Sequence, residues 1–235
     1  MRKIIIASTS TIYGSGYLEY ILQDLKAFFK NVDTIIFIPY ARPSGISHND
    51  YTKIAKQAFT KIDKNLKGIH EFKNPIEALK TAEAIFVGGG NTFVLANQLH
   101  KNNLIDTLKQ VVNNGTPYLG TSAGSNICGL TIKTTNDMPI VYPPNFNALG
   151  LVPFNINPHY LDPNPNSKHK GETRETRIKE FHHYNTQPVI GLREGSWLHV
   201  NNNSIILKGE LTARIFEYNK TPYEVESGTA LNQLK

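Results

Sequence analysis

The chain contains Gly120-Thr121-Ser122-Ala123-Gly124 directly after a short apolar run at residues 116–119. This G-x-S-x-G pattern between a predicted strand and a predicted helix is typical of a nucleophile elbow, the tight turn that exposes a serine hydroxyl. Small neighbours are needed there, because the two glycines let the chain close up and Ala123 leaves a backbone N–H free to bind an oxyanion. The pattern is short, so an ordinary glycine-rich turn explains these five residues equally well.

Strand-like and helix-like segments alternate along the first 130 residues. Apolar and β-branched runs predict strands at residues 3–8, 34–38, 68–72, 84–87 and 116–119. Helical spacing of apolar residues predicts helices at residues 17–30, 50–64, 75–82, 91–100 and 103–113. This order predicts an α/β fold with a mostly parallel central sheet and helices on both faces. The turns that follow 84–87 and 116–119 would then open at the same edge of the sheet.

The second half of the chain has a different character. Residues 133–166 are rich in Pro, Asn and Asp, which predicts a long ordered loop region of the kind that often carries function. A helix is predicted at 171–184, a buried strand at 189–192, and short antiparallel strands at 197–200, 204–208 and 212–218. We found no linker or internal repeat, so we expect residues 1–235 to form a single domain.

Composition narrows the class of protein. The chain has 235 residues, 40% of them hydrophobic, and no apolar run approaches the ~20 residues of a membrane span. The apolar stretch after Met1 is shorter than the ~7 residues of a signal-peptide core, so it is interpreted as a first strand. A single cysteine fits a reducing cytoplasm. The net charge of +6 comes from scattered cations, which favours a small acidic substrate and predicts no nucleic-acid or membrane partner.

Serine catalysis needs a general base and an acid that orients it. His159 is a candidate base because it follows the apolar run at residues 151–156, and a structural loop histidine is the competing interpretation. Glu194 directly follows the predicted strand at 189–192, where an acidic turn residue would also fit. Asp137 is a rival candidate for the acid, although an Asn-Asp pair before proline also suits a turn.

A second glycine-rich turn, Gly88-Gly89-Gly90-Asn91, follows a predicted strand and opens a predicted helix. It lacks the spacing of a dinucleotide-binding or P-loop motif. A backbone N–H in this turn could instead be a second oxyanion donor beside Ala123, and a plain tight turn remains the alternative. No metal-binding spacing is present, so we expect neither a metal nor another cofactor.

Several longer motifs, taken together, closely resemble the peptidase E family of bacterial aspartyl dipeptidases. The similarity runs in order from the first strand to about residue 200. It rests on the two glycine-rich turns with their flanking residues and on Thr134-Thr135-Asn136-Asp137-Met138-Pro139-Ile140-Val141, Ile156-Asn157-Pro158-His159 and His169-Lys170-Gly171-Glu172-Thr173-Arg174. The resemblance implies a serine peptidase with a class I glutamine amidotransferase-like fold, which cleaves dipeptides with an N-terminal aspartate and uses no metal.

The resemblance also implies roles for particular residues. The nucleophile falls on Ser122, the general base on His159 and the third member of the triad on Glu194. The order Ser, His, Glu differs from the Ser, Asp/Glu, His order of α/β-hydrolases. The implied oxyanion donors are the backbone N–H groups of Gly90 and Ala123. Arg174 is the candidate that binds the substrate aspartate, with Asn91 as a possible second contact and Asp137 as a possible supporting residue.

The sequence departs from the family pattern near the implied site. Thr121 stands where a tryptophan is expected, Arg193 where a proline is expected, and Ser125 where an alanine is expected. We expect Thr121 and Arg193 to border the pocket and to affect substrate range. Two alternatives stay open: a cyanophycinase-like peptidase that cleaves β-Asp-Arg, and a non-catalytic binding protein with the same fold. The sequence does not distinguish a monomer from a dimer.

Overall fold

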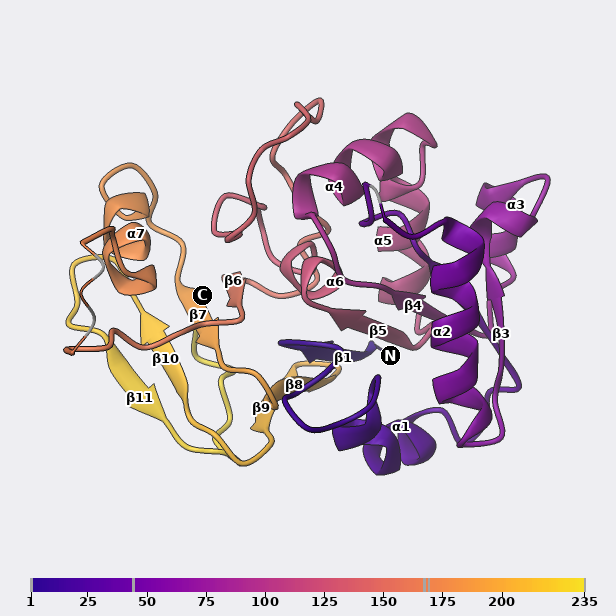
Figure 1. Ribbon diagram of the computed structural model, residues 1–235, viewed down its shortest axis with the longest axis horizontal. Coiled ribbons are helices and arrows are strands. Elements are labelled where there is room, and N and C mark those ends of the chain that lie inside the picture. The colour runs from indigo at the N-terminus through magenta and orange to yellow at the C-terminus, as the bar shows by residue number, and fades with distance from the viewer. Residues whose placement is uncertain (1, 44, 167, 169, 235) are drawn as a thin grey trace.

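The computed structural model describes residues 2–43, 45–166, 168 and 170–234. Its main element is a seven-stranded sheet in the middle of the molecule (Figure 1). In spatial order the strands are β3 (Asn65–Gly68), β2 (Thr34–Ile38), β4 (Ala84–Val87), β5 (Tyr118–Thr121), β1 (Lys3–Ala7), β8 (Trp197–Asn201) and β9 (Ser204–Lys208). The first five are parallel, and β8 and β9 are added as antiparallel strands beside β1. The predicted α/β fold with a mostly parallel central sheet is therefore confirmed.

Helices cover both faces of this sheet and bury its central strands on both sides. In β1, Ile4 and Ile6 belong to one apolar cluster, whereas Ile5 and Ala7 belong to the other. The helices α1 (Leu22–Phe28) and α2 (His48–Thr60) pack on the second cluster. The first cluster takes α3 (Pro75–Lys80), α4 (Thr92–Lys101), α5 (Ile105–Asn113) and α6 (Ala123–Asn126).

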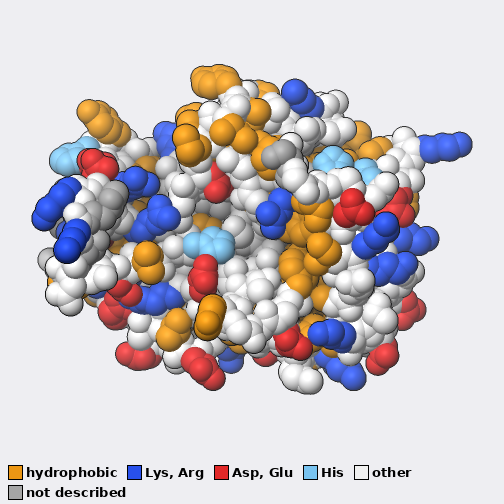
Figure 2. Space-filling model, viewed as in Figure 1, with side chains coloured by type: hydrophobic (Ala, Val, Ile, Leu, Met, Phe, Trp, Pro, Cys, Tyr) orange, Lys and Arg blue, Asp and Glu red, His pale blue; other side chains and the backbone are white. Residues whose placement is uncertain are grey.

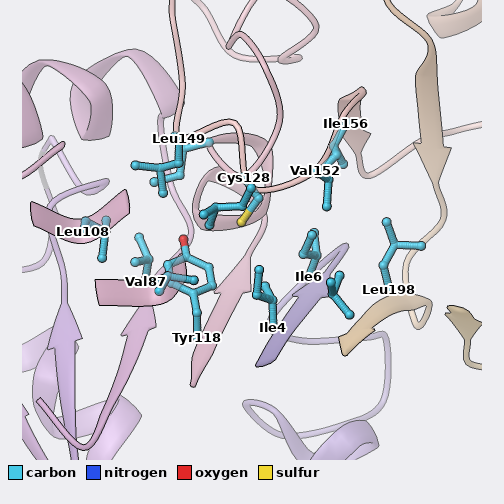
Figure 3. Packing of buried hydrophobic residues seen from close by; sticks show 14 of the residues in the cluster. Ile4, Ile6, Val87, Leu108, Tyr118, Cys128, Leu149, Val152, Ile156 and Leu198 are labelled. Atoms are coloured by element: carbon cyan, nitrogen blue, oxygen red, sulfur yellow. The ribbon is translucent and has the colours of Figure 1, made fainter. Parts of the chain in front are cut away.

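A second sheet of four strands lies beside the first, on the left in Figure 1. Its spatial order is β11 (Tyr223–Val225), β10 (Ala213–Phe216), β7 (Val189–Leu192) and β6 (Asn155–Pro158), with α7 (Arg174–Phe181) packed nearby. Figure 3 shows Ile156 of β6 in the same apolar cluster as Ile6 of β1. This shared core supports our proposal that the chain forms one domain.

Some predicted elements differ from the structure for local reasons. The predicted strand at 68–72 is wrong: β3 ends at Gly68, and Ile69–Glu71 forms a 3₁₀ turn, because the Glu71 carboxylate accepts the Gly68 N–H at 2.6 Å. The predicted helix at 17–30 is shorter and is split into a 3₁₀ turn at Glu19–Ile21 followed by α1. Leu18 has a left-handed backbone with φ of 59°, which prevents the helix from starting earlier.

Cys128 packs in the apolar core next to the turn that contains Gly124. Its thiol lies 3.4 Å from the carbonyl oxygen of Gly124, and the Tyr118 hydroxyl donates to the same oxygen at 2.7 Å (Figure 3). Burial raises the pKa of the Cys128 thiol to about 12, so it stays protonated and acts as a small packing residue. None of the helices in the described part of the chain is long and apolar enough to cross a bilayer.

Candidate active site

Ser122 lies in a strained turn between β5 and α6. Its backbone has φ of 53° and ψ of −110°, a conformation that costs about 1–3 kcal/mol and is typical of functional sites. The two flanking glycines make the turn possible. A Cβ on Gly120 would lie 2.4 Å from the carbonyl oxygen of Gly124, and one on Gly124 would lie 2.2 Å from that of Val87. The elbow geometry therefore follows from close backbone packing that only glycine permits.

His159 and Glu194 complete a hydrogen-bonded chain with Ser122. The Nε2 atom of His159 lies 2.9 Å from Ser122 Oγ, and its Nδ1 atom lies 2.6 Å from Glu194 Oε1. A carboxylate only accepts hydrogen bonds, so Nδ1 carries the proton and Nε2 is free to accept the serine proton. The two side chains meet because β6 and β7 are parallel neighbours, and His159 and Glu194 lie just beyond their carboxyl ends.

Ser8, which the sequence did not single out, binds the backbone of His159 directly. Its buried hydroxyl accepts the backbone N–H of His159 at 2.9 Å and donates to the carbonyl oxygen of Leu192 at 2.7 Å. These two bonds hold His159 in a left-handed conformation with φ of 53°. A polar residue at the end of the predicted strand at 3–8 was the available signal, because that position lies at the carboxyl edge of the sheet.

The predicted oxyanion donors belong to the two glycine-rich turns: Ala123 directly follows Ser122, and Gly90 lies in the turn between β4 and α4. Ala123 is the first residue of α6, so its N–H has no partner within the helix. Gly90 has φ of 142°, and a Cβ there would lie 2.3 Å from the carbonyl oxygen of Ala41. Neither N–H donates a hydrogen bond to any acceptor in the described residues. A Cβ on the neighbouring Gly89 would lie 3.0 Å from Ser122 Cβ, which shows how closely this turn packs on the nucleophile.

Asp137 and Asn91 join the loop between α6 and β6 to the start of α4. Asp137 Oδ2 accepts the Thr92 N–H at 2.7 Å, and Asn91 Nδ2 donates to the Met138 carbonyl oxygen at 2.9 Å. Asn91 Oδ1 also caps α4. Asp137 lines the small hollow above Ser122, whereas the acid bonded to the imidazole is Glu194. The structure therefore places Asp137 beside the site and away from the imidazole nitrogen that Glu194 binds.

Arg174 begins α7 and lines a neighbouring hollow with Arg177, Asp162 and the residues before the helix. Partial burial and the nearby charge of Arg177 lower the pKa of the Arg174 guanidinium, and the Asp137 carboxylate opposes that shift. His169, which begins the sequence motif that contains Arg174, lies outside the described residues.

Thr121 and Arg193, the two departures that we expected to affect substrate range, do not line the hollow above Ser122. Thr121 is fully buried in β5, and the guanidinium of Arg193 binds Asp162 and Glu224. Neither residue lines the hollow above Ser122, contrary to our expectation from the sequence. Figure 2 shows this face of the molecule, with a histidine in a central depression, acidic side chains on two sides of it and a group of Lys and Arg to the left. The described ranges contain no group of three or more His, Cys, Asp or Glu side chains arranged to hold a metal ion.

Comparison with known proteins identifies the family. The family model for peptidase family S51 matches residues 4–208. A protein named "Peptidase E" from Streptomyces coelicolor is 46% identical over 232 residues, which are 99% of this chain and 94% of the relative. A "Probable alpha-aspartyl dipeptidase" from Drosophila melanogaster is 47% identical over 219 residues, or 92% of this chain and 90% of the relative.

A solved structure agrees on the fold. The crystal structure of a peptidase from an acI-B1 Actinobacterium aligns with a TM-score of 0.72 at 16% identity, and the alignment covers 98% of this chain and 96% of the other. Since the family model spans most of the chain and the relatives match it almost end to end, this protein belongs to peptidase family S51.

Proposed function

We propose that this protein is a serine dipeptidase that hydrolyses Asp-Xaa dipeptides, with Ser122 as nucleophile, His159 as general base and Glu194 as the acid that orients it. The observation that carries the proposal is the continuous hydrogen-bonded chain from Ser122 Oγ through both ring nitrogens of His159 to Glu194. The names of the relatives, peptidase E and alpha-aspartyl dipeptidase, support the choice of substrate.

The arrangement of these groups supports an acyl-enzyme mechanism. His159 Nε2 takes the proton of the Ser122 hydroxyl as the oxygen attacks the peptide carbonyl, and Glu194 stabilises the imidazolium that forms. The N–H groups of Gly90 and Ala123 bind the oxyanion, where a single donor is worth about 3 kcal/mol. His159 then protonates the leaving amine, and water releases aspartate from the acyl-enzyme.

We assign the recognition of aspartate to Arg174, because a guanidinium binds a carboxylate with two parallel hydrogen bonds. Asn91 and Asp137 support the pocket by holding the loop after α6 against α4. The proposed partner is a small acidic dipeptide, with no nucleic acid, membrane or cofactor involved. The proposed compartment is the cytoplasm, which is consistent with a single buried cysteine.

The test is the release of free aspartate from Asp-Leu by the purified protein, with Ala-Leu as a second substrate and a chelator present. We expect turnover of Asp-Leu alone, and at least a thousandfold loss in Ser122→Ala, about the size of triad effects in other serine peptidases. Hydrolysis of β-Asp-Arg with Asp-Leu left intact would contradict the substrate assignment. Wild-type activity in Ser122→Ala would contradict the mechanism.

The role of Arg174 has its own test, with Arg177→Ala as the matched control because both arginines line the same hollow. Arg174→Ala should lower kcat/KM for Asp-Leu about a hundredfold, since a hydrogen bond between charged groups is worth up to about 3 kcal/mol. The Arg177→Ala variant should keep most of the preference for aspartate. Equal losses in both variants would show that general positive charge, and not Arg174, selects the substrate.

A further inference from the structure

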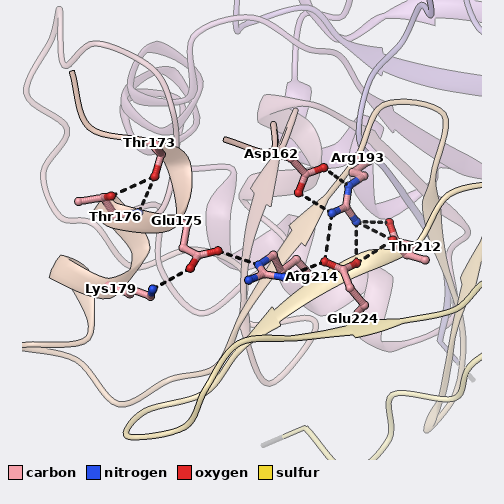
Figure 4. A network of polar contacts seen from close by, with 9 residues as sticks. All are labelled: Asp162, Thr173, Glu175, Thr176, Lys179, Arg193, Thr212, Arg214 and Glu224. Atoms are coloured by element: carbon pink, nitrogen blue, oxygen red, sulfur yellow. Dashed lines mark hydrogen bonds and ion pairs between the residues drawn. The ribbon is translucent and has the colours of Figure 1, made fainter. Parts of the chain in front are cut away.

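Arg193 connects two carboxylates, those of Asp162 and Glu224 (Figure 4). Its Nε and Nη2 atoms donate to the two oxygens of Asp162 at 2.8 and 2.7 Å. Its Nη1 and Nη2 atoms donate to the two oxygens of Glu224 at 2.9 and 3.1 Å. The Arg193 side chain is only 14% exposed, and bidentate ion pairs of this kind fix the geometry of both side chains better than a single hydrogen bond does.

The position of this pair in the chain links it to the site. Asp162 lies three residues after His159, and Arg193 lies one residue before Glu194. The β6–β7 pairing ends at Pro158 opposite Leu192, and the Tyr160 N–H adds one bond to the Leu192 carbonyl oxygen at 3.1 Å. Beyond that point, the Arg193–Asp162 pair holds together the two segments that carry the base and its acid.

Glu194 needs such support, because its side chain is 52% exposed. In the described residues, its carboxylate makes no hydrogen bond except the one to His159. The direction of the Glu194 side chain is therefore set by the tight turn of residues 193–196. In this turn the Ser196 N–H donates to the Arg193 carbonyl oxygen at 3.1 Å, and Gly195 has φ of 87°. Anchoring the Arg193 side chain anchors the first residue of this turn.

We propose that Arg193 is a positioning residue, which holds Glu194 within hydrogen-bonding distance of His159 through its bidentate ion pair with Asp162. The inference rests on the proposed catalytic role of the triad. A purely structural role is the competing explanation, since Arg193 also belongs to a longer chain of ion pairs through Glu224, Arg214 and Glu175 that holds α7 to the second sheet (Figure 4).

The first experiment compares the two carboxylate partners of Arg193. Asp162→Asn keeps the shape of the side chain but removes the charge and one of the two hydrogen bonds from Arg193. The resulting misplacement of Glu194 should lower kcat for Asp-Leu about ten- to a hundredfold, with KM little changed. Glu224→Gln is the matched control, because it weakens another ion pair of the same guanidinium, with a residue of β11 that lies outside the segments carrying His159 and Glu194. It should keep kcat near that of wild type even if its melting temperature falls. Equal kcat values for the two variants would overturn the proposal.

The second experiment combines Arg193→Lys with Glu194→Gln. Lysine keeps the charge but cannot form the bidentate ion pair with Asp162, so kcat should fall in the wild-type background. In the Glu194→Gln background the same substitution should cost less than about twofold, because the group to be positioned is already lost. An equal loss in both backgrounds would show a structural role. Wild-type activity of Glu194→Gln alone would instead refute the proposed triad, so the two failures are distinguishable.

Discussion

Ser122 and His159 both have positive φ angles, 53° in each case, and each is held there by contacts from a distant part of the chain. The carbonyl oxygen of Ala7 accepts the Ser122 N–H at 3.2 Å, and the next residue, Ser8, accepts the N–H of His159. The end of β1 therefore supports the nucleophile and the base at the same time. At the scale of single residues, this strand end is as important to the site as the reacting groups.

Ser8→Ala tests this support. The substitution leaves the partly buried N–H of His159 without its acceptor, so we expect the free energy of unfolding to fall by about 1–3 kcal/mol. We also expect kcat for Asp-Leu to fall at least tenfold, because the imidazole loses its fixed position. Denaturant titration and steady-state kinetics measure the two effects.

Ser125→Ala is the matched control. Ser125 is equally buried, and its hydroxyl donates to the Ala7 carbonyl oxygen at 2.6 Å, but that oxygen keeps its bond from the Ser122 N–H. Its loss should cost less than about 1 kcal/mol and leave kcat nearly unchanged. If Ser8→Ala were no more harmful to kcat than Ser125→Ala, Ser8 would have no special link to the base.

At the scale of elements, α7 determines where Arg174 lies. The helix has only eight residues, and it begins with a cap in which Thr173 Oγ1 accepts the Thr176 N–H at 3.1 Å. Its other anchor is the Glu175 carboxylate, which accepts from Arg214 of β10 at 2.8 Å. A short helix has little stability of its own, so the position of Arg174 depends on these contacts.

We predict that Thr173→Ala raises KM for Asp-Leu several-fold and changes kcat little, because loss of a cap costs about 1 kcal/mol and frays the turn that carries Arg174. Asn74→Ala is the control: Asn74 caps α3 by accepting the Glu77 N–H at 3.2 Å, and α3 does not contribute to the site. It should cost similar stability and leave KM unchanged. A matching rise of KM in both variants would contradict the prediction.

The ion pairs of the second sheet make its stability depend on pH. Partial burial raises the pKa of Glu224, but hydrogen bonds from Arg193, Thr212 and Arg214 outweigh burial and lower it to about 2. Because the pKa in the folded state lies below the unfolded value of about 4.3, this group stabilises the fold above that pH. The contribution is lost as the pH falls toward 2.

Glu224→Gln should therefore flatten part of the decline of stability between about pH 5 and pH 2. Urea midpoints measured across this range for both proteins provide the test. Parallel curves for wild type and variant would mean that Glu224 is not held in its charged form by the folded state.

At the scale of the whole molecule, the two sheets share one apolar core. Ile215 of β10 and Ile6 of β1 are fully buried members of the same cluster. We predict a single unfolding transition in urea, in which far-UV circular dichroism and the fluorescence of Trp197 change together, as expected for one cooperative domain. Trp197 is the only tryptophan in the chain and lies in β8 of the central sheet.

The variant Ile215→Ala makes this prediction sharper. It should lower the stability reported by Trp197 by about 2–5 kcal/mol, although the substitution lies in the other sheet. Leu211→Ala, at a position that is 46% exposed, should change it by less than about 1 kcal/mol. If Ile215→Ala left the unfolding free energy reported by Trp197 fluorescence unchanged, the two sheets would unfold separately.

Local sequence determined the parts of this protein that depend on neighbouring residues. The buried strands at 34–38 and 84–87 have the observed bounds of β2 and β4, because short apolar runs with β-branched residues fit strands that are buried on both faces. The elbow at Ser122 could be predicted as well, since its close backbone approaches require the two glycines that the sequence shows.

Tertiary structure alone decided what holds the candidate site together. His159 and Glu194 are 35 residues apart and meet through the parallel pairing of β6 and β7 in a second sheet that the sequence did not predict. Ser8 contacts His159 across 151 residues, and Arg193, expected at the pocket, binds Asp162 and Glu224 instead. Periodicity and turn chemistry report on neighbours within a few residues, whereas these contacts arise from packing between elements, which no local pattern contains.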